Sequence, residues 1–228
     1  MRYKLIIVGM MLSMSAGAAS MTELNYQDSD AGTSAYRTRI LVTPDFLRMD
    51  AGVDDDNFTL LNRATGQLYN VMRDERKAYR YVTQGLKIKL PKPWKITHRI
   101  TQINASTRHF DWAVNGKPCG KITATRKLQP DTAVALQQYW RALATSQWQT
   151  WQRTPADMRN VCDLARYVVA IPVVFQYGLP LTDEANDGHS RHYQSDSVVP
   201  LRNELFVVPE VYEVVKIENT QPSASQRK

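Results

Sequence analysis

The chain contains two cysteines, Cys119 and Cys162, which lie 43 positions apart. A thiol could act as a nucleophile beside one of the four histidines, but no thiol-hydrolase sequence surrounds either cysteine. In an oxidising compartment two such cysteines most simply pair. We therefore predict a disulfide, which would stabilise the fold by roughly 4 kcal/mol through loop closure. A catalytic thiol is the alternative.

Two short stretches carry oxygen or imidazole ligands that a metal ion could use. The acidic turn at 50–57 lacks the full spacing and the distal glutamate of a calcium loop, so we interpret it as a solvated hairpin tip. The stretch His189-Ser190-Arg191-His192 is polar and loop-like, and we expect its histidines to be solvated rather than bound to metal. We predict no metal site and no cofactor.

The sequence lacks the short motifs that carry common catalytic chemistry. It has no G-x-S-x-G, no H-E-x-x-H and no glycine-rich loop that could cradle a phosphate. The acid pair Asp183-Glu184 falls in a polar stretch at 182–188, which we interpret as a solvent-facing loop. We predict that the protein is not an enzyme. A hydrolase whose residues are scattered along the chain is the minor alternative.

Five aromatic side chains are candidates for the wall of an apolar pocket, because rings that carry a polar atom suit ligand walls and interfaces. They are Trp94, Trp112, Tyr139, Trp140 and Trp148. The alternative is that these rings simply cover a sheet as core. We favour that alternative for most of them, since a stripe at helical spacing usually packs inward.

Positive charge is concentrated in one part of the chain. Between residues 84 and 127 there are ten basic residues and one acid, Asp111, so this segment carries +9. We predict a docking face for anionic lipid headgroups or an acidic envelope protein. Its residues are Lys87, Lys89, Lys92 and Lys95. A solvated face that discourages edge pairing of strands would account for them equally well.

Residues 1–19 have the pattern of a signal peptide. Arg2 and Lys4 precede an apolar run at 5–12 that is too short to span a bilayer, and 16–18 gives the small-x-small pattern of a cleavage site. An N-terminal membrane anchor is the alternative. Removing the leader leaves 27 basic and 22 acidic residues, a charge of +5. We predict a periplasmic protein, and export disfavours nucleic acid as a partner.

The elements that must position these residues follow from composition and periodicity. The chain has 228 residues, 43% of them hydrophobic and 22% charged, which is typical of a globular domain. Short alternating runs between 22 and 128 predict an antiparallel meander. Residues 130–153 predict an amphipathic helix. A second helix is expected from Pro155 to Pro172, followed by strands at 173–177 and 205–209.

Several of these runs resemble one family. The early runs are Arg37-Thr38-Arg39-Ile40, Phe46-Leu47-Arg48-Met49-Asp50 and Phe58-Thr59-Leu60-Leu61-Asn62, and the late ones are Gly178-Leu179-Pro180-Leu181 and Leu205-Phe206-Val207-Val208-Pro209-Glu210-Val211-Tyr212. Together they resemble the exported lipoprotein-carrier-like (LolA/LolB-like) superfamily. The resemblance implies an α+β fold, in which a curved, unclosed antiparallel β-sheet (a half-barrel) wraps around a late helical insertion. It implies a single domain at 20–218. The polar composition of 219–228 separately predicts a flexible tail.

The resemblance also implies a function. In the best-known members an apolar cavity between sheet and helices holds acyl chains. We therefore expect an exported binding protein for an apolar or acylated ligand, or for a lipidated partner. The alternative is an envelope scaffold protein that docks through the basic sheet face. The chain departs from the family in its late, cross-linked helical segment and in lacking a lipid-anchor cysteine.

Overall fold

The structure is a computed structural model that describes residues 19–81, 83, 88 and 91–217. The expected signal peptide, apart from its last residue, and the expected tail at 219–228 lie outside the described residues. Lys87 and Lys89 also lie outside them. Within the described part, no helix is both long enough and apolar enough to cross a membrane.

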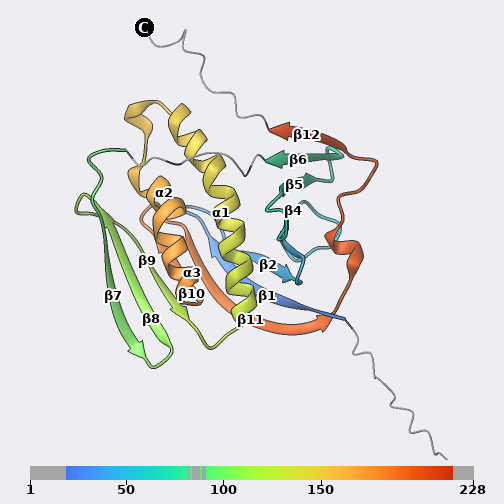
Figure 1. The fold of residues 1–228 in the computed structure, drawn as a ribbon, viewed down its shortest axis with the longest axis horizontal. Coiled ribbons are helices and arrows are strands. Elements are labelled where there is room, and N and C mark those ends of the chain that lie inside the picture. Colours follow the sequence, from blue (N-terminus) through green and yellow to red (C-terminus); the bar gives the residue numbers. More distant parts are fainter. Residues whose placement is uncertain (1–18, 82, 84–87, 89–90, 218–228) are drawn as a thin grey trace, which may run out of the picture.

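The described chain forms one large sheet and two helical segments (Figure 1). The strands are β1 (Ser20–Ser29), β2 (Tyr36–Val42), β3 (Phe46–Asp50), β4 (Phe58–Asn62), β5 (Leu68–Met72), β6 (Lys77–Tyr81), β7 (Ile96–Asn104), β8 (Thr107–Val114), β9 (Lys117–Thr125), β10 (Leu179–Ala185), β11 (Ser190–Pro200) and β12 (Glu213–Ile217). The helices are α1 (Pro130–Arg153), α2 (Val161–Ala165) and α3 (Ile171–Tyr177). A π-helical turn, Arg166–Ala170, joins α2 to α3, and short 3₁₀ turns occupy Ala156–Met158 and Asn203–Phe206.

The sheet has 12 strands in the order β12-β6-β5-β4-β3-β2-β1-β11-β10-β9-β8-β7 and does not close into a barrel. Every pairing is antiparallel except that of β12 with β6, which is parallel. The expectation of a wholly antiparallel sheet is therefore wrong at this edge. β12 follows a long crossing segment rather than a tight turn, and only such a crossover can bring a strand in parallel.

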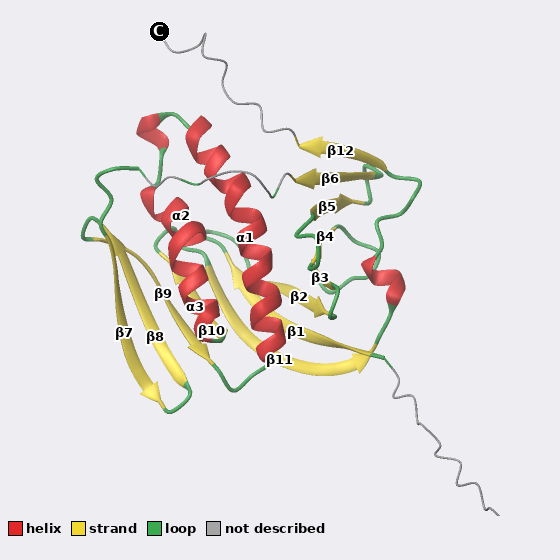
Figure 2. Cartoon of the chain, in the orientation of Figure 1, coloured by secondary structure: helices red, strands yellow, loops and turns green. Residues whose placement is uncertain are grey.

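The sheet curves around the helices, and its concave face carries the main core (Figure 2). Leu24, Ile40 and Leu61 of the sheet are fully buried there. Leu136 of α1 and Phe175 of α3 pack into the same cluster. The open, curved sheet with helices in its concavity agrees with the expected architecture, and α1 has the predicted bounds of 130–153.

The convex face of the β1–β6 half is covered by residues 201–212, which we call the strap. Leu205 and Phe206 of the strap are buried, and the Phe206 ring stacks on Phe46 with 6.0 Å between ring centroids. The predicted strand at 205–209 is therefore wrong. Its apolar residues are buried by packing across the outer face of the sheet rather than by pairing with a neighbouring strand.

Two further expectations are corrected. Residues 173–177 belong to α3 and not to a strand, because Pro172 lies in the first turn of that helix, where its missing N–H is not needed. The stretch at 182–188 is not a loop throughout, since β10 extends to Ala185 and β11 begins at Ser190. Gly178 permits the entry into β10, because a Cβ there would lie 2.2 Å from the Thr125 carbonyl oxygen.

Candidate functional site

Two adjacent spaces lie between the concave face and the helices. The inner space is apolar and has a free volume of only about 20 Å³. Its walls come from Tyr26, Ile122, Leu136, Trp140, Ile171, Val174, Phe175, Pro180, Asp183 and Arg191. The outer space is polar and measures about 330 Å³. Trp140, Asp183 and Arg191 line both spaces, so these three residues form the boundary between them.

The outer space, which we call the polar cavity, is lined mainly by charged residues. Carboxylates come from Asp30, Asp163, Asp183 and Asp187, and cationic or titratable side chains come from Arg166, Arg191 and His189. Trp140, Gln147 and Tyr167 complete the wall. The sheet, helix α1, helix α2 and the π-helical turn all contribute, so the site exists only in the assembled fold.

Two ion pairs organise the inner end of the polar cavity. The Arg191 guanidinium donates through Nε (2.8 Å) and Nη2 to the two oxygens of Asp28, which also accepts from the Thr38 hydroxyl. Arg166 Nη2 donates to Asp183 Oδ2 at 2.6 Å. Within the described residues Arg166 Nη1 and Asp183 Oδ1 have no hydrogen-bond partner, although both atoms are buried.

Burial shapes the titration of these groups. It raises the pKa of the Asp183 carboxyl, and the nearby Arg166 and Arg191 oppose that rise. Burial also raises the pKa of Asp163, with a further increase from the Asp187 charge. For Arg191 burial alone would lower the pKa, but the hydrogen bond with Asp28 raises it, so the guanidinium stays charged.

The five predicted aromatic residues lie in four different places. Trp140 borders the polar cavity and the inner space, where its ring stacks on Tyr167 with 5.2 Å between centroids. Tyr139 is buried in the main core. Trp148 is buried and stacks on Trp151, which also meets Trp94. Trp112 packs with the two cysteines. The structure thus brings one of the five, Trp140, to the internal spaces.

The predicted disulfide between Cys119 and Cys162 is confirmed. Cys119 lies at the irregularity in the β8–β9 pairing and Cys162 in α2, so the bond ties the helical segment to the sheet. Both cysteines are buried together with Trp112 and Val114. A catalytic thiol is therefore not available at either position.

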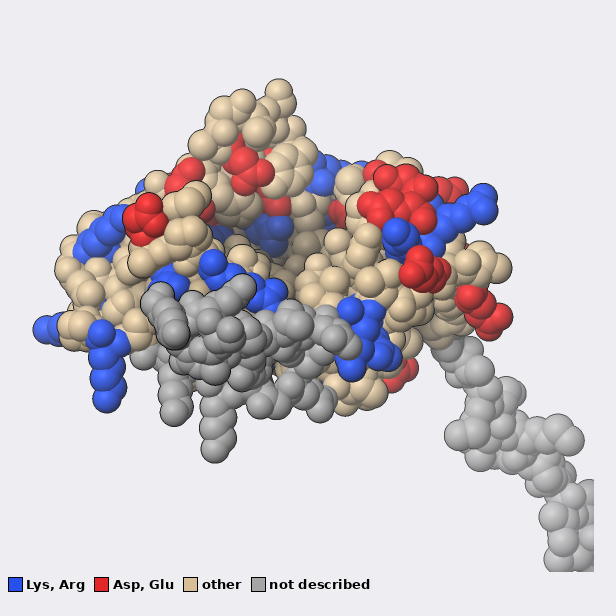
Figure 3. Space-filling model, turned by 90° about the horizontal axis from the view of Figure 1, so that it is seen from above, with Lys and Arg blue, Asp and Glu red and all other residues tan. Residues whose placement is uncertain are grey.

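Of the predicted basic face, the structure describes Lys92 and Lys95, which are exposed before β7. Figure 3 shows Lys and Arg side chains at the end of the molecule that carries β7–β9, while acidic side chains gather at the opposite end, near β4–β6. The acidic turns at 54–56 and 74–75 belong to that second end. The charge asymmetry read from the sequence is thus also an asymmetry between the two ends of the sheet.

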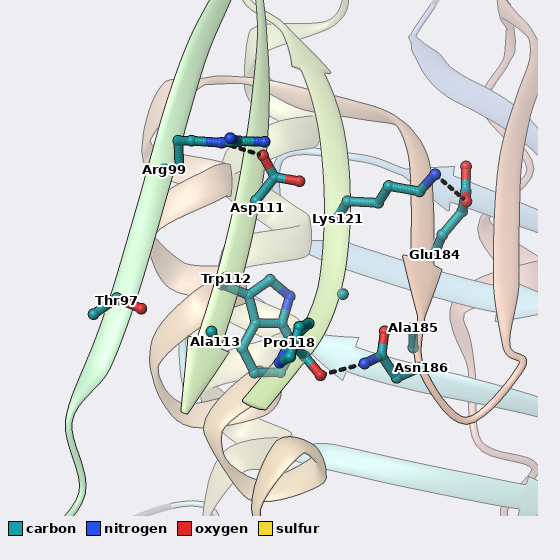
Figure 4. Close-up of a pocket in the computed structure, with 11 residues that line it drawn as sticks. Thr97, Arg99, Asp111, Trp112, Ala113, Pro118, Lys121, Glu184, Ala185 and Asn186 are labelled. Atoms are coloured by element: carbon teal, nitrogen blue, oxygen red, sulfur yellow. Dashed lines mark hydrogen bonds and ion pairs between the residues drawn. The ribbon is translucent and has the colours of Figure 1, made fainter. Parts of the chain in front are cut away.

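A second hollow, of about 420 Å³, lies on the outer face of β7–β10 (Figure 4). Its charged side chains pair with one another: Arg99 with Asp111 at 3.1 Å and Lys121 with Glu184 at 2.9 Å. Asn186 donates to the Pro118 carbonyl at its floor. Because these charges are paired within the groove, it is a weaker candidate than the internal spaces.

The sequence did not predict the residues of the polar cavity, because a local irregularity in strand pairing decides which way Asp183 faces. A bulge between Pro180 and Thr182 in the pairing of β10 with β9 shifts the alternation and turns Asp183 inward. Arg191 lies in β11 and faces Asp28, so 189–192 is not the expected solvated loop. Within the described residues no three histidine, cysteine or acidic side chains are grouped as metal ligands.

Comparison with known proteins gives matches among solved structures. No protein-family model and no curated protein matches the chain. Among solved structures, PNGF-II in two crystal forms aligns with 87% of this chain at 11% and 10% identity, with TM-scores of 0.41 and 0.37. This chain spans about a third of the PNGF-II chain, 31% and 32% in the two forms.

A LolA superfamily protein from Nitrosomonas europaea is also similar. It aligns with 84% of this chain and 91% of its own, at 9% identity and a TM-score of 0.25. Scores this low carry no conclusion about shared fold or function. Membership of the LolA/LolB-like superfamily therefore stays a prediction.

Proposed function

We propose that this protein is an exported binding protein that holds an apolar or acylated ligand between its helices and the concave face of its sheet, and that it acts by binding rather than by catalysis. One observation carries the proposal: an apolar space in the core adjoins a larger polar cavity, and both share Trp140, Asp183 and Arg191. A ligand that has one apolar and one polar end needs an apolar space and a polar space next to each other.

The inner space must widen to accept a ligand, because its free volume of about 20 Å³ is far below the roughly 300–1,000 Å³ of small-molecule pockets. We expect α1 rather than α2 to move, because α2 is fixed to the sheet by the disulfide, whereas α1 meets the sheet through side-chain contacts such as that of Asp131 with Arg63. The ligand would therefore enter by separating α1 from the sheet, with its apolar end replacing contacts of Leu136.

The proposal fits an exported protein. A disulfide persists in oxidising compartments such as the periplasm. The leader pattern at 1–19 supports export from the sequence side. The exposed Lys92 and Lys95 are compatible with approach to an anionic membrane surface.

The test is binding of N-phenyl-1-naphthylamine, a neutral apolar dye, to delipidated protein. We expect saturable binding that Leu136→Phe weakens about tenfold or more, because extra volume fills the inner space. The matched control is Val134→Phe on the exposed side of the same helix, which should bind the dye normally. Mass spectrometry of extracts from the undelipidated protein should identify a bound lipid.

The proposal fails if the dye does not bind saturably and no lipid is extracted. It also fails if Leu136→Phe and Val134→Phe bind equally well while circular dichroism shows both to be folded.

A further inference from the structure

The buried ion pair of Arg166 and Asp183 leaves one polar atom of each side chain without a hydrogen-bond partner among the described residues. Its single contact joins Nη2 to Oδ2 at 2.6 Å. This leaves Arg166 Nη1 as a buried donor and Asp183 Oδ1 as a buried acceptor, neither with a partner among the described residues. Buried polar atoms are nearly always hydrogen-bonded in folded proteins. Two adjacent exceptions in a cavity wall therefore point to a ligand that supplies both bonds.

The charges around the polar cavity restrict what that ligand can be. Both arginines are already engaged by carboxylates, Arg191 by Asp28 and Arg166 by Asp183, and the His189 ring contacts Asp30 at 2.8 Å. Asp163 and Asp187 add further carboxylates to the wall. An anionic group would meet excess negative charge here. A cationic group could satisfy Asp183 Oδ1, but it would be repelled by Arg166.

An uncharged group with hydroxyls meets both requirements. A hydroxyl donates one hydrogen bond and accepts others, so a pair of hydroxyls can donate to Asp183 and accept from Arg166. The Trp140 and Tyr167 rings add an apolar wall against which the carbon skeleton of such a group can pack.

We infer that the polar cavity binds the head of an acylated ligand, and that this head is an uncharged polyol, such as a glycerol or a sugar. The inference rests on the proposed function, because the polyol is the polar end of the ligand whose apolar end enters the inner space. Asp183, which borders both spaces, would then contact the ligand where its two ends join.

The test is displacement of bound N-phenyl-1-naphthylamine by amphiphiles that share one dodecyl-length chain. The uncharged probes are monolauroylglycerol and dodecyl glucoside, whose relative strength distinguishes glycerol from sugar. The charged probes are dodecyl phosphate and dodecylamine. We expect the better uncharged probe to act at about tenfold lower concentration than either charged probe, as expected for added hydrogen bonds to charged groups.

Removing the ion pair as a unit should remove the preference. In the double variant Arg166→Met with Asp183→Leu, the four probes should compete within about threefold of one another, each displacement being referred to the dye affinity measured for that variant. The matched control is Lys121→Met with Glu184→Leu, which deletes an ion pair on the outer face of the same two-strand region. This control should keep the full preference.

A single substitution keeps the inference testable if the double variant does not fold. Asp183→Asn preserves size and removes one negative charge, so dodecyl phosphate should gain relative to the uncharged probes. The inference is overturned if a charged probe is the best competitor for the native protein, or if every variant keeps the native order. Absence of dye binding by the native protein instead overturns the proposed function, and this inference with it.

Discussion

Several charged side chains are buried in this fold and join segments that lie far apart in the sequence. On the outer face, Arg48 is fully buried and donates to Asp50 at 2.6 Å and to the Leu205 carbonyl at 2.8 Å. Arg39 binds Asp50 and Asp54, and Arg202 of the strap also binds Asp54. Asp50 and Asp54 thus join the β2–β4 strands to the strap, so this end of the acidic turn is not the solvated tip that its sequence indicates.

Asp54 should contribute stability that depends on pH. Its hydrogen bond with Arg39, and then that with Arg202, lowers the pKa of the folded carboxyl below its usual range. Such a group stabilises the fold above its unfolded pKa of about 3.9, and the contribution is lost as the pH falls through the folded pKa. We expect Asp54→Asn to lower the free energy of unfolding at pH 7, with the difference from the native protein closing below about pH 4.

Urea denaturation at several pH values measures this difference. Asp55→Asn is the control, because the Asp55 side chain is 96% exposed and its nearest ion-pair contact, with Arg73, is at 4.0 Å. Equal effects of the two substitutions at pH 7 would contradict the assigned role of Asp54.

Residue periodicity predicted part of the sheet and failed where the chain departs from simple alternation, since β7, β11 and β12 were not predicted. The runs at 46–50 and 58–62 form β3 and β4 as expected, because one face of each is apolar. Asp183 was placed in solvent because nothing in the sequence marks the bulge that turns it inward. Burial of Asp28, Asp183 and Arg191 depends on partners 10 or more residues away, which local patterns do not specify.

The helical segment from α2 to α3 is the element whose observed structure differs most from the structure that its sequence predicts. Val173, Val174 and Phe175 have the composition of a strand, yet they lie in α3. Val174 and Phe175 reach the concave core from there, and that burial outweighs the strand preference. The π-helical turn before α3 interrupts the regular α-helical hydrogen bonding, and a regular helical period does not predict such a turn.

The disulfide should stabilise this element against separation from the sheet. Replacing both residues, Cys119→Ala with Cys162→Ala, removes a cross-link between positions 43 apart and should lower the free energy of unfolding by up to about 4 kcal/mol. Denaturation with and without dithiothreitol measures the effect. Dithiothreitol should lower the denaturation midpoint of the native protein and leave that of the double variant unchanged. The prediction is contradicted if the midpoint of the native protein stays the same after its disulfide has been fully reduced.

At the scale of the whole molecule, one arginine holds the helix layer to the β1–β6 half of the sheet. Arg63, in the turn after β4, donates to Asp131 at 2.7 and 2.8 Å and to Gln138 at 2.9 Å, both in α1. It also donates to the Thr43 carbonyl at 2.6 Å. If ligand entry separates α1 from the sheet, these contacts must break first.

Arg63→Met should therefore speed uptake of N-phenyl-1-naphthylamine while lowering the free energy of unfolding by about 1–2 kcal/mol. Stopped-flow fluorescence measures the uptake rate. Arg141→Met, on the exposed side of the same helix, is the control and should change neither quantity. Slower or unchanged uptake in a folded Arg63→Met protein would place the entry route elsewhere.

The position of β1 has a consequence for how the chain is made. β1 lies between β2, its neighbour in sequence, and β11, with Ser20 opposite Pro200. The β1–β6 meander consists of successive local pairings and can form early in synthesis. One edge of β1 stays unpaired, and the apolar outer face stays bare, until residues 190–212 have been synthesised. A chain in which only the β1–β6 meander has formed would therefore expose both this edge and this apolar face, and such surfaces favour association with chaperones or with neighbouring chains.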